Sequence, residues 1–195
     1  MRKLLNKLQK AFILFTGKIY LNKYFPFLVY NPRFHRIKGD DVRSLITMAQ
    51  PGDLVFRSTK GYLALMFIPG DWDHVGVYIG DNKVIHSVGK KGVIIEDIIT
   101  FFRADIGALV RINELTPEQI DSAKSFCKEA LEDNQGYDYY FKDDNGRFYC
   151  SELVNDAFSG MFDHDRRKSY GVEVIDPQAV FDSNKVATIY DTRTT

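Results

Sequence analysis

Short runs of alternating apolar and polar residues occupy the middle of the chain. They are rich in β-branched side chains, and Gly, Asp and Asn separate them: Leu54–Arg57, His74–Ile79, Lys83–Val88, Val93–Glu96 and Ala108–Ile112. Such runs with turn residues between them are typical of half-buried β-strands. The pattern therefore predicts a sheet in this part of the chain, and Val186–Tyr190 supplies a further strand to close it.

Helical spacing of apolar residues appears outside this block. It predicts a short helix at Gly39–Gln50, a longer one from Thr116 to about Asp133, one that begins at Cys150, and a short one after Asp176-Pro177. Thr116 is a strong start signal, because it is a capping residue followed by proline and then by Gln119, which completes a capping box. Strands grouped apart from helices indicate an α+β fold.

Composition permits one well-buried domain, since the chain has 195 residues of which 45% are apolar. The formal net charge is zero, but the first 50 residues carry ten Lys and Arg against two Asp, which is +8, and the remainder carries the balancing −8. We therefore divide the chain into a basic extension, residues 1–50, and a folded domain, residues 51–195. The acidic body gives no support for nucleic acid as a partner.

The basic extension is also amphipathic. Its apolar residues recur at helical spacing and its lysines lie on another face: Leu4, Leu8, Ala11, Phe12, Phe15 and Ile19 against Lys3, Lys7, Lys10 and Lys18. Residues 1–38 are therefore expected to form a helix that binds an anionic membrane surface or the acidic body of the domain itself. The apolar segment is too short to span a bilayer and lacks a small-residue cleavage site. The expected location is cytoplasmic or membrane-peripheral, with export as the alternative.

The two cysteines differ in their surroundings. Cys127 falls on the apolar stripe of the predicted Thr116 helix and is expected to be a small core residue. Cys150 follows a polar, glycine-containing loop and opens a helix, where unpaired N–H groups and the positive end of the helix dipole favour a thiolate over a thiol. Two cysteines make no disulfide framework, so a reducing compartment is the simpler expectation. Cys150 is the candidate nucleophile.

Two histidines lie on neighbouring predicted strands. His74 opens an alternating, β-branched run and is the candidate base for Cys150. Its side chain is expected on the same face of the strand as Gly76. A two-residue turn at Asp81-Asn82 would pair His86 with Val77 and put it on the opposite face. A three- or five-residue connection pairs His86 with Gly76 and brings the two imidazoles together. We expect the odd register; an even one would leave Glu96 or a backbone carbonyl to orient His74.

These segments, read together, resemble a known family. The sequences His-Val-Gly-Val-Tyr-Ile-Gly, Val-Ile-His-Ser, Tyr-Asp-Tyr-Tyr-Phe and Phe-Tyr-Cys-Ser-Glu-Leu-Val are similar to those of the circularly permuted NlpC/P60 group of papain-like proteins, in particular the YiiX-like cysteine hydrolases. The resemblance runs from about Pro51 to about Tyr190. It implies an antiparallel sheet or barrel packed against helices that include the nucleophile helix. It also implies Cys150 as nucleophile, His74 as general base and His86 as third member, with Glu96 as the acidic alternative.

The expected reaction is cleavage of an amide or ester through an acyl-thioester, as by an amidase or peptidase, without a cofactor. The substrate would be a small peptide, a wall peptide or an acyl lipid. Two alternatives stay open: a lipid acyltransferase or acyl hydrolase at a membrane surface, and a non-catalytic binding module with the same fold. A metal site built from Cys150, His74 and His86 is not expected, because their spacing lacks a paired-ligand signature.

Overall fold

The computed structural model describes residues 19–21, 28–30, 37–59, 70–142, 145–169 and 172–194. The chain divides into two compact units, Met1–Arg36 and Ile37–Thr195. In the first unit, β1 (Ile19–Leu21) pairs with β2 (Leu28–Tyr30) in antiparallel register. The prediction that Ile19 extends an amphipathic helix is therefore wrong, since its β-branched and aromatic neighbourhood favours a strand. The rest of that predicted helix, residues 1–18, lies outside the described residues.

The second unit is built on a six-stranded sheet in the order β12-β7-β3-β4-β5-β6. Its strands are β3 (Leu54–Ser58), β4 (His74–Gly80), β5 (Lys83–Val88), β6 (Gly92–Asp97), β7 (Ile106–Ile112) and β12 (Val186–Asp191). All neighbouring pairs are antiparallel. Every predicted strand is confirmed, and the last one extends the sheet beside β7. The described strands form an open sheet, with β12 and β6 at its edges.

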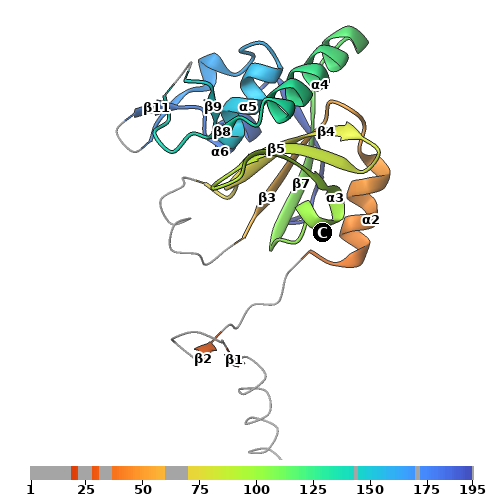
Figure 1. Ribbon diagram of the computed structural model, residues 1–195. Helices are drawn as coiled ribbons and strands as arrows, with labels where there is room; N and C mark the ends of the chain where they lie inside the picture. The colour runs from red at the N-terminus through yellow and green to blue at the C-terminus, as the bar shows by residue number, and fades with distance from the viewer. Residues whose placement is uncertain are drawn as a thin grey trace, which may run out of the picture. The chain divides into compact units, whose positions relative to one another are not determined.

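Helices cover both faces of this sheet, as Figure 1 shows. On one face, α4 (Pro117–Glu132) and α5 (Cys150–Ala157) share a buried apolar cluster with Val75 and Val77 of β4. On the other, α2 (Gly39–Met48) and α3 (Ile98–Phe101) share a second cluster with Tyr78 of the same strand. Alternation along β4 thus supplies both cores. Together with α6 (Pro177–Phe181), these elements confirm the α+β fold.

The start of α4 follows its sequence signal closely. The Thr116 N–H donates to Gln119 Oε1 at 2.8 Å, and the Gln119 N–H donates to Thr116 Oγ1 at 3.3 Å. Several shorter elements had no sequence signal, because two to four residues are too few for a periodic pattern. They are α3, a parallel pair of β8 (Gly136–Tyr137) and β9 (Arg147–Phe148), a pair of β10 (Arg167–Ser169) and β11 (Val172–Val174), and a 3-10 turn at Asp163–Asp165. No helix in the described part of the chain is long and apolar enough to cross a membrane.

The β4–β5 hairpin decides which histidines meet. Asp81 and Asn82 form a tight turn with positive φ angles of 51° and 58°, and Gly80 pairs with Lys83. The register then shifts between Tyr78 and Gly80, so that Tyr78 pairs with Val84. This connection of five residues confirms the odd register. We expected a two-residue turn at Asp81-Asn82 to exclude the odd register, and this expectation is wrong. The turn is present, but the bulge at Ile79 adds one residue to β4 and restores the odd register.

Candidate functional site

Strands β4 and β5 part at one end of the sheet. Their pairing ends at Val77–Ile85, although β4 begins three residues earlier and β5 continues to Val88. Beyond that point β4 pairs with β3, and β5 pairs with β6. A Cβ added to Gly76 would lie 3.0 Å from the Cβ of His86, so this glycine allows the two strands to approach closely just beyond their last pair.

The N-terminus of α5 lies against these two separated strand ends. The Ser87 hydroxyl on β5 donates to the Phe148 carbonyl at 2.6 Å, and the Val75 N–H on β4 donates to the Cys150 sulfur. Cys150 is the first residue of α5, and the Glu152 carboxylate accepts from the Tyr149 N–H at 3.2 Å to close the helix start. The candidate nucleophile is therefore held at a helix N-terminus, beside the residue that follows His74.

The two histidines are in direct contact. His74 Nε2 lies 2.7 Å from His86 Nδ1, and the two rings meet nearly edge to face, with an interplanar angle of 75°. On the far side of His86, Nε2 lies 3.5 Å from Glu96 Oε2, which is an ion-pair contact and too long for a good hydrogen bond. His86 and Glu96, the two candidates for the third catalytic residue, thus follow one another on the Nε2 side of His74. Its Nδ1 is the ring nitrogen on the side away from His86.

Arg57 and Phe101 complete the surroundings of the pair, and neither was predicted. Arg57 pairs with His74 in the β3–β4 register, and its guanidinium lies 4.6 Å above the Phe101 ring. The same ring packs against both imidazoles, with centroid distances of 5.8 Å to His74 and 5.2 Å to His86. The available signal for Arg57 was a charge that ends the otherwise buried run Leu54–Phe56. Phe101 had none, since α3 has only four residues.

Burial dominates the protonation of the site. It lowers the pKa of His74 well below the usual range for histidine, and repulsion from His86 in its protonated form and from Arg57 lowers that pKa further. Burial also raises the pKa of the Cys150 thiol to about 11, against hydrogen bonds from Val75 and Ser151 that lower it. The resting site is thus a neutral thiol and neutral imidazoles. Desolvation of the sulfur thus works against the thiolate that the helix N-terminus is expected to favour.

Cys127 lies on the buried stripe of α4 as predicted. Its side chain belongs to the apolar cluster of that face, and burial raises the pKa of its thiol to about 12. Among the described residues, no group of three or more His, Cys, Asp and Glu side chains is arranged to hold a metal ion. The chemistry that the described residues present is that of Cys150 and its histidines.

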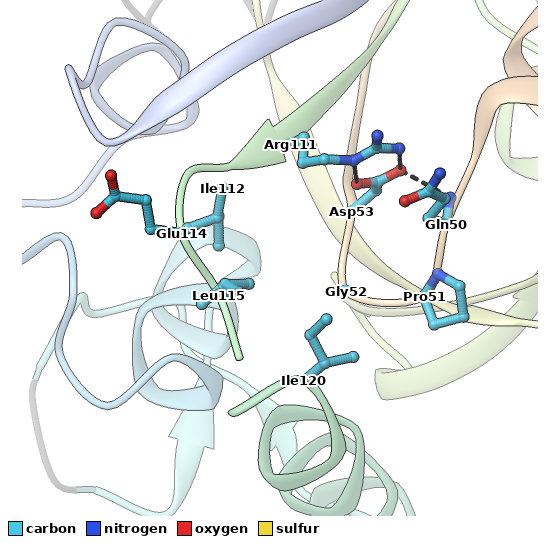
Figure 2. Close-up of a pocket in the computed structure, with 9 residues that line it drawn as sticks. All are labelled: Gln50, Pro51, Gly52, Asp53, Arg111, Ile112, Glu114, Leu115 and Ile120. Atoms are coloured by element: carbon cyan, nitrogen blue, oxygen red, sulfur yellow. Dashed lines mark hydrogen bonds and ion pairs between the residues drawn. The ribbon is translucent and has the colours of Figure 1, made fainter. Parts of the chain in front are cut away.

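A cavity of about 230 Å³ opens at the other end of β3 and is not part of this site. Figure 2 shows the Arg111 guanidinium paired directly with the Asp53 carboxylate in its lining. Arg111 Nε and Nη2 donate to the two carboxylate oxygens at 2.7 and 2.8 Å, and the Gln50 N–H also donates to Asp53 at 2.7 Å. The charges of Arg111 and Asp53 satisfy each other, and Glu114 is the other charged residue of the lining.

Comparison with known proteins relates the chain to two groups. Protein OPG091 of Vaccinia virus (strain Western Reserve) is 29% identical over 157 residues, which are 78% of this chain and 91% of that protein. Protein OPG091 of Monkeypox virus is 28% identical over the same shares. The probable lipoprotein peptidase YaeF of Escherichia coli (strain K12) is 29% identical over 93 residues, which are 46% of this chain and 33% of that protein. No solved structure matches.

A family model covers most of the second unit. It matches residues 48–190, which include the whole sheet up to Tyr190, the start of α5 and both histidines. The model describes permuted papain-like amidases, and the order of the site in this chain, histidines before cysteine, agrees with it. The chain therefore belongs to the permuted papain-like amidase family, YaeF/YiiX, also described as the C92 family.

Proposed function

We propose that this protein is a cysteine amidase that cleaves its substrate through an acyl-thioester on Cys150. The observation that carries the proposal is the 2.7 Å contact between His74 Nε2 and His86 Nδ1, at the strand end where the Val75 N–H holds the Cys150 sulfur. Nucleophile, base and orienting group are the three parts that such catalysis needs. The family is one of amidases, which supports the same reaction class.

The row of contacts sets which nitrogen of His74 accepts a proton. The Glu96 carboxylate, 3.5 Å from His86 Nε2, favours the tautomer that carries its proton on that nitrogen, so that His86 Nδ1 is an acceptor and His74 Nε2 donates to it. Nδ1 of His74 then carries a lone pair. Because the resting thiol is neutral, its proton moves to Nδ1 while the sulfur attacks the carbonyl carbon.

The remaining steps follow from this arrangement. The oxyanion of the tetrahedral intermediate accepts from the backbone N–H of Cys150 at the start of α5. The His74 imidazolium then gives its proton to the leaving amine, and the C–N bond breaks to leave the acyl-thioester. Water attacks the thioester with His74 again as base, which releases the acid and restores the thiol. An alcohol or amine in place of water makes the same site a transferase.

The test is the detection of the acyl-enzyme by intact-protein mass spectrometry. The probes are small peptide amides, wall-peptide fragments, N-acyl lipids and lipidated peptides, the last because one relative is named a probable lipoprotein peptidase. We expect an adduct of the acyl mass on Cys150, absent from Cys150→Ala. Cys127→Ala is the matched control, since Cys127 is a second buried thiol without a histidine contact. It is expected to keep the adduct.

The outcomes separate the alternatives. An adduct that water releases supports hydrolysis, and an adduct that passes to an added alcohol or amine supports transfer. Cys150 that takes no acyl group from any probe, and reacts with iodoacetamide equally in wild type and His74→Gln, would contradict the amidase and favour a binding module.

A second candidate function is acyl chemistry at a membrane surface, favoured by the +8 charge of residues 1–50 against −8 in the remainder. Residues 1–38 would hold the protein on anionic lipid. The full chain is expected to co-sediment with vesicles that contain an anionic lipid, and a variant with Lys3, Lys7 and Lys10 changed to Gln is expected to stay in solution. Equal sedimentation of both variants would contradict this candidate.

A further inference from the structure

Arg57 is a charged side chain enclosed beside the two histidines, and the mechanism above does not use it. Only 22% of its side chain is exposed, and burial lowers its pKa from the usual range for arginine. Keeping a cation in such a place is costly unless its contacts stabilise it. The contacts of Arg57 therefore indicate which role its charge has in the site.

Those contacts converge on the histidine pair. Arg57 Nη1 donates to the Phe101 carbonyl at 2.9 Å, which fixes the guanidinium above the Phe101 ring. That ring touches both imidazoles, so it is one flat surface against which the cation and the two histidines are packed. A shift of the guanidinium would therefore move the ring that orients His74 and His86.

Arg57 also shares an oxygen with His86. Glu96 Oε2 lies 3.5 Å from Arg57 Nη1 and 3.5 Å from His86 Nε2. The carboxylate is thus drawn from two sides and is held where it can accept from His86. Without the guanidinium, the Glu96 side chain on the edge strand β6, which is 25% exposed, would lose one of the two contacts of that oxygen.

We propose that Arg57 is a positioning residue of this site: through Phe101 and Glu96 it holds His86 in the orientation that leaves Nδ1 of His74 unprotonated, and its fixed charge opposes the imidazolium. The inference rests on the proposed function. It assigns to β3 a part of the site that neither the histidine motif nor the cysteine motif contains.

The charges that face the histidines set the sign of the effect. They are Arg57 of β3, Glu96 of β6 and Lys91 between β5 and β6, whereas Asp73 before β4 acts on Arg57 itself. Asp73 is held by Ser58 Oγ at 2.6 Å and by the Thr59 N–H at 2.9 Å. Arg57 lowers the pKa of both histidines, whereas Glu96 raises that of His86. Removal of Arg57 therefore raises the pKa of the pair.

The test compares Arg57→Met, which removes the charge, with Arg57→Lys, which keeps it. The readout is the pH dependence of kcat/KM on an amide that acylates Cys150 in the wild type. The acid limb requires a neutral His74, so we expect it to move up by about one pH unit in Arg57→Met and to return most of the way in Arg57→Lys. Arg111→Met is the control, because it removes a cation at the other end of β3 and is expected to leave the limb in place.

A second readout does not need activity. The ring protons of His74 and His86 are followed by NMR as the pH falls, in wild type, Arg57→Met and Arg57→Lys, and we expect the same upward shift in Arg57→Met. Coincident titrations in wild type and Arg57→Met would overturn the proposal, even in a protein that turns over. A wild type without a Cys150 adduct would overturn the proposed function instead, and the titration would still decide the role of Arg57.

Discussion

Strand β3 has an arginine–carboxylate pair near each of its ends, and the two pairs differ in how completely they are closed. At the first, two nitrogens of Arg111 meet both oxygens of Asp53 at 2.7 and 2.8 Å. At the second, one nitrogen of Arg57 lies 3.5 Å from one oxygen of Glu96, and that oxygen also faces His86. The first carboxylate is held by Arg111 and by the Gln50 N–H, away from the site, whereas the second is shared with the site.

The pKa values of the two arginines move in opposite directions, because a different cause dominates each of them. Hydrogen bonds to Asp53 raise the pKa of Arg111, while burial lowers that of Arg57 because its carboxylate contact is too long to compensate. An arginine–carboxylate pair joined by short hydrogen bonds, which we call closed, stabilises the fold and has little electrostatic effect on neighbouring groups. An open pair stabilises less and leaves its charges to act on adjacent titratable groups. The loose pair is therefore the one beside the chemistry.

The largest difference between the two ends of β3 is expected when His74, the proposed base at the Arg57 end, is replaced. His74→Gln removes the proton acceptor of Cys150, so kcat/KM on an acylating amide should fall by roughly 1,000-fold. The free energy of unfolding should change little, because Gln keeps a polar group near His86. Steady-state kinetics and urea unfolding measure the two quantities. A fall in kcat/KM of less than tenfold would contradict the assignment of His74.

At the closed end, the large effect should fall on stability. Asp53→Asn leaves Arg111 without its counter-charge beside a carboxamide that is almost fully buried, which should cost about 3 kcal/mol of unfolding free energy and lower Tm by roughly 10 °C. Activity per folded molecule should stay near that of the wild type. Thermal unfolding and active-site titration by acyl-adduct mass are the measurements. A selective loss of activity with unchanged Tm would show that the two ends are not separate.

A smaller effect at the open end should have a diagnostic sign. Glu96→Gln keeps a group that can accept from His86 but removes the charge, so kcat/KM should fall by about tenfold. Because Glu96 raises the pKa of His86, its loss should move the acid limb to lower pH, opposite to the shift expected for Arg57→Met. The pH profile of kcat/KM tests this. Shifts of equal sign in the two variants would mean that Glu96 and Arg57 do not act on the histidines from opposite sides.

Much of the site was accessible from the sequence because it depends on local patterns. A helix start at Cys150 and a strand beginning at His74 were predicted from the order of apolar, polar and turn residues, and position in the predicted helices set Cys127 apart from Cys150. The contact of His74 with His86 followed from the strand register. The tight turn at Asp81-Asn82 would alone have given the wrong register, and the bulge that corrects it has no sequence signal.

What the sequence did not provide depends on packing between distant elements. Arg57 and Glu96 are 39 residues apart and meet although β4 and β5 lie between their strands. Phe101 lies in a four-residue helix, too short for a periodic signal. The protonation of Cys150 could not be predicted either, because the helix N-terminus is visible in the sequence whereas the depth of the sulfur is not.

Because the Val75 N–H donates a hydrogen bond to the Cys150 sulfur, the Val75 amide should report the chemical state of that sulfur. A thiol, an alkylated sulfur and a thioester differ in charge density and in size, so each should give Val75 a different amide chemical shift and rate of exchange with deuterated solvent. The Val75 amide signal on β4 therefore follows turnover without a label on the substrate. Unidentified substrates can be ranked by how they change that single resonance.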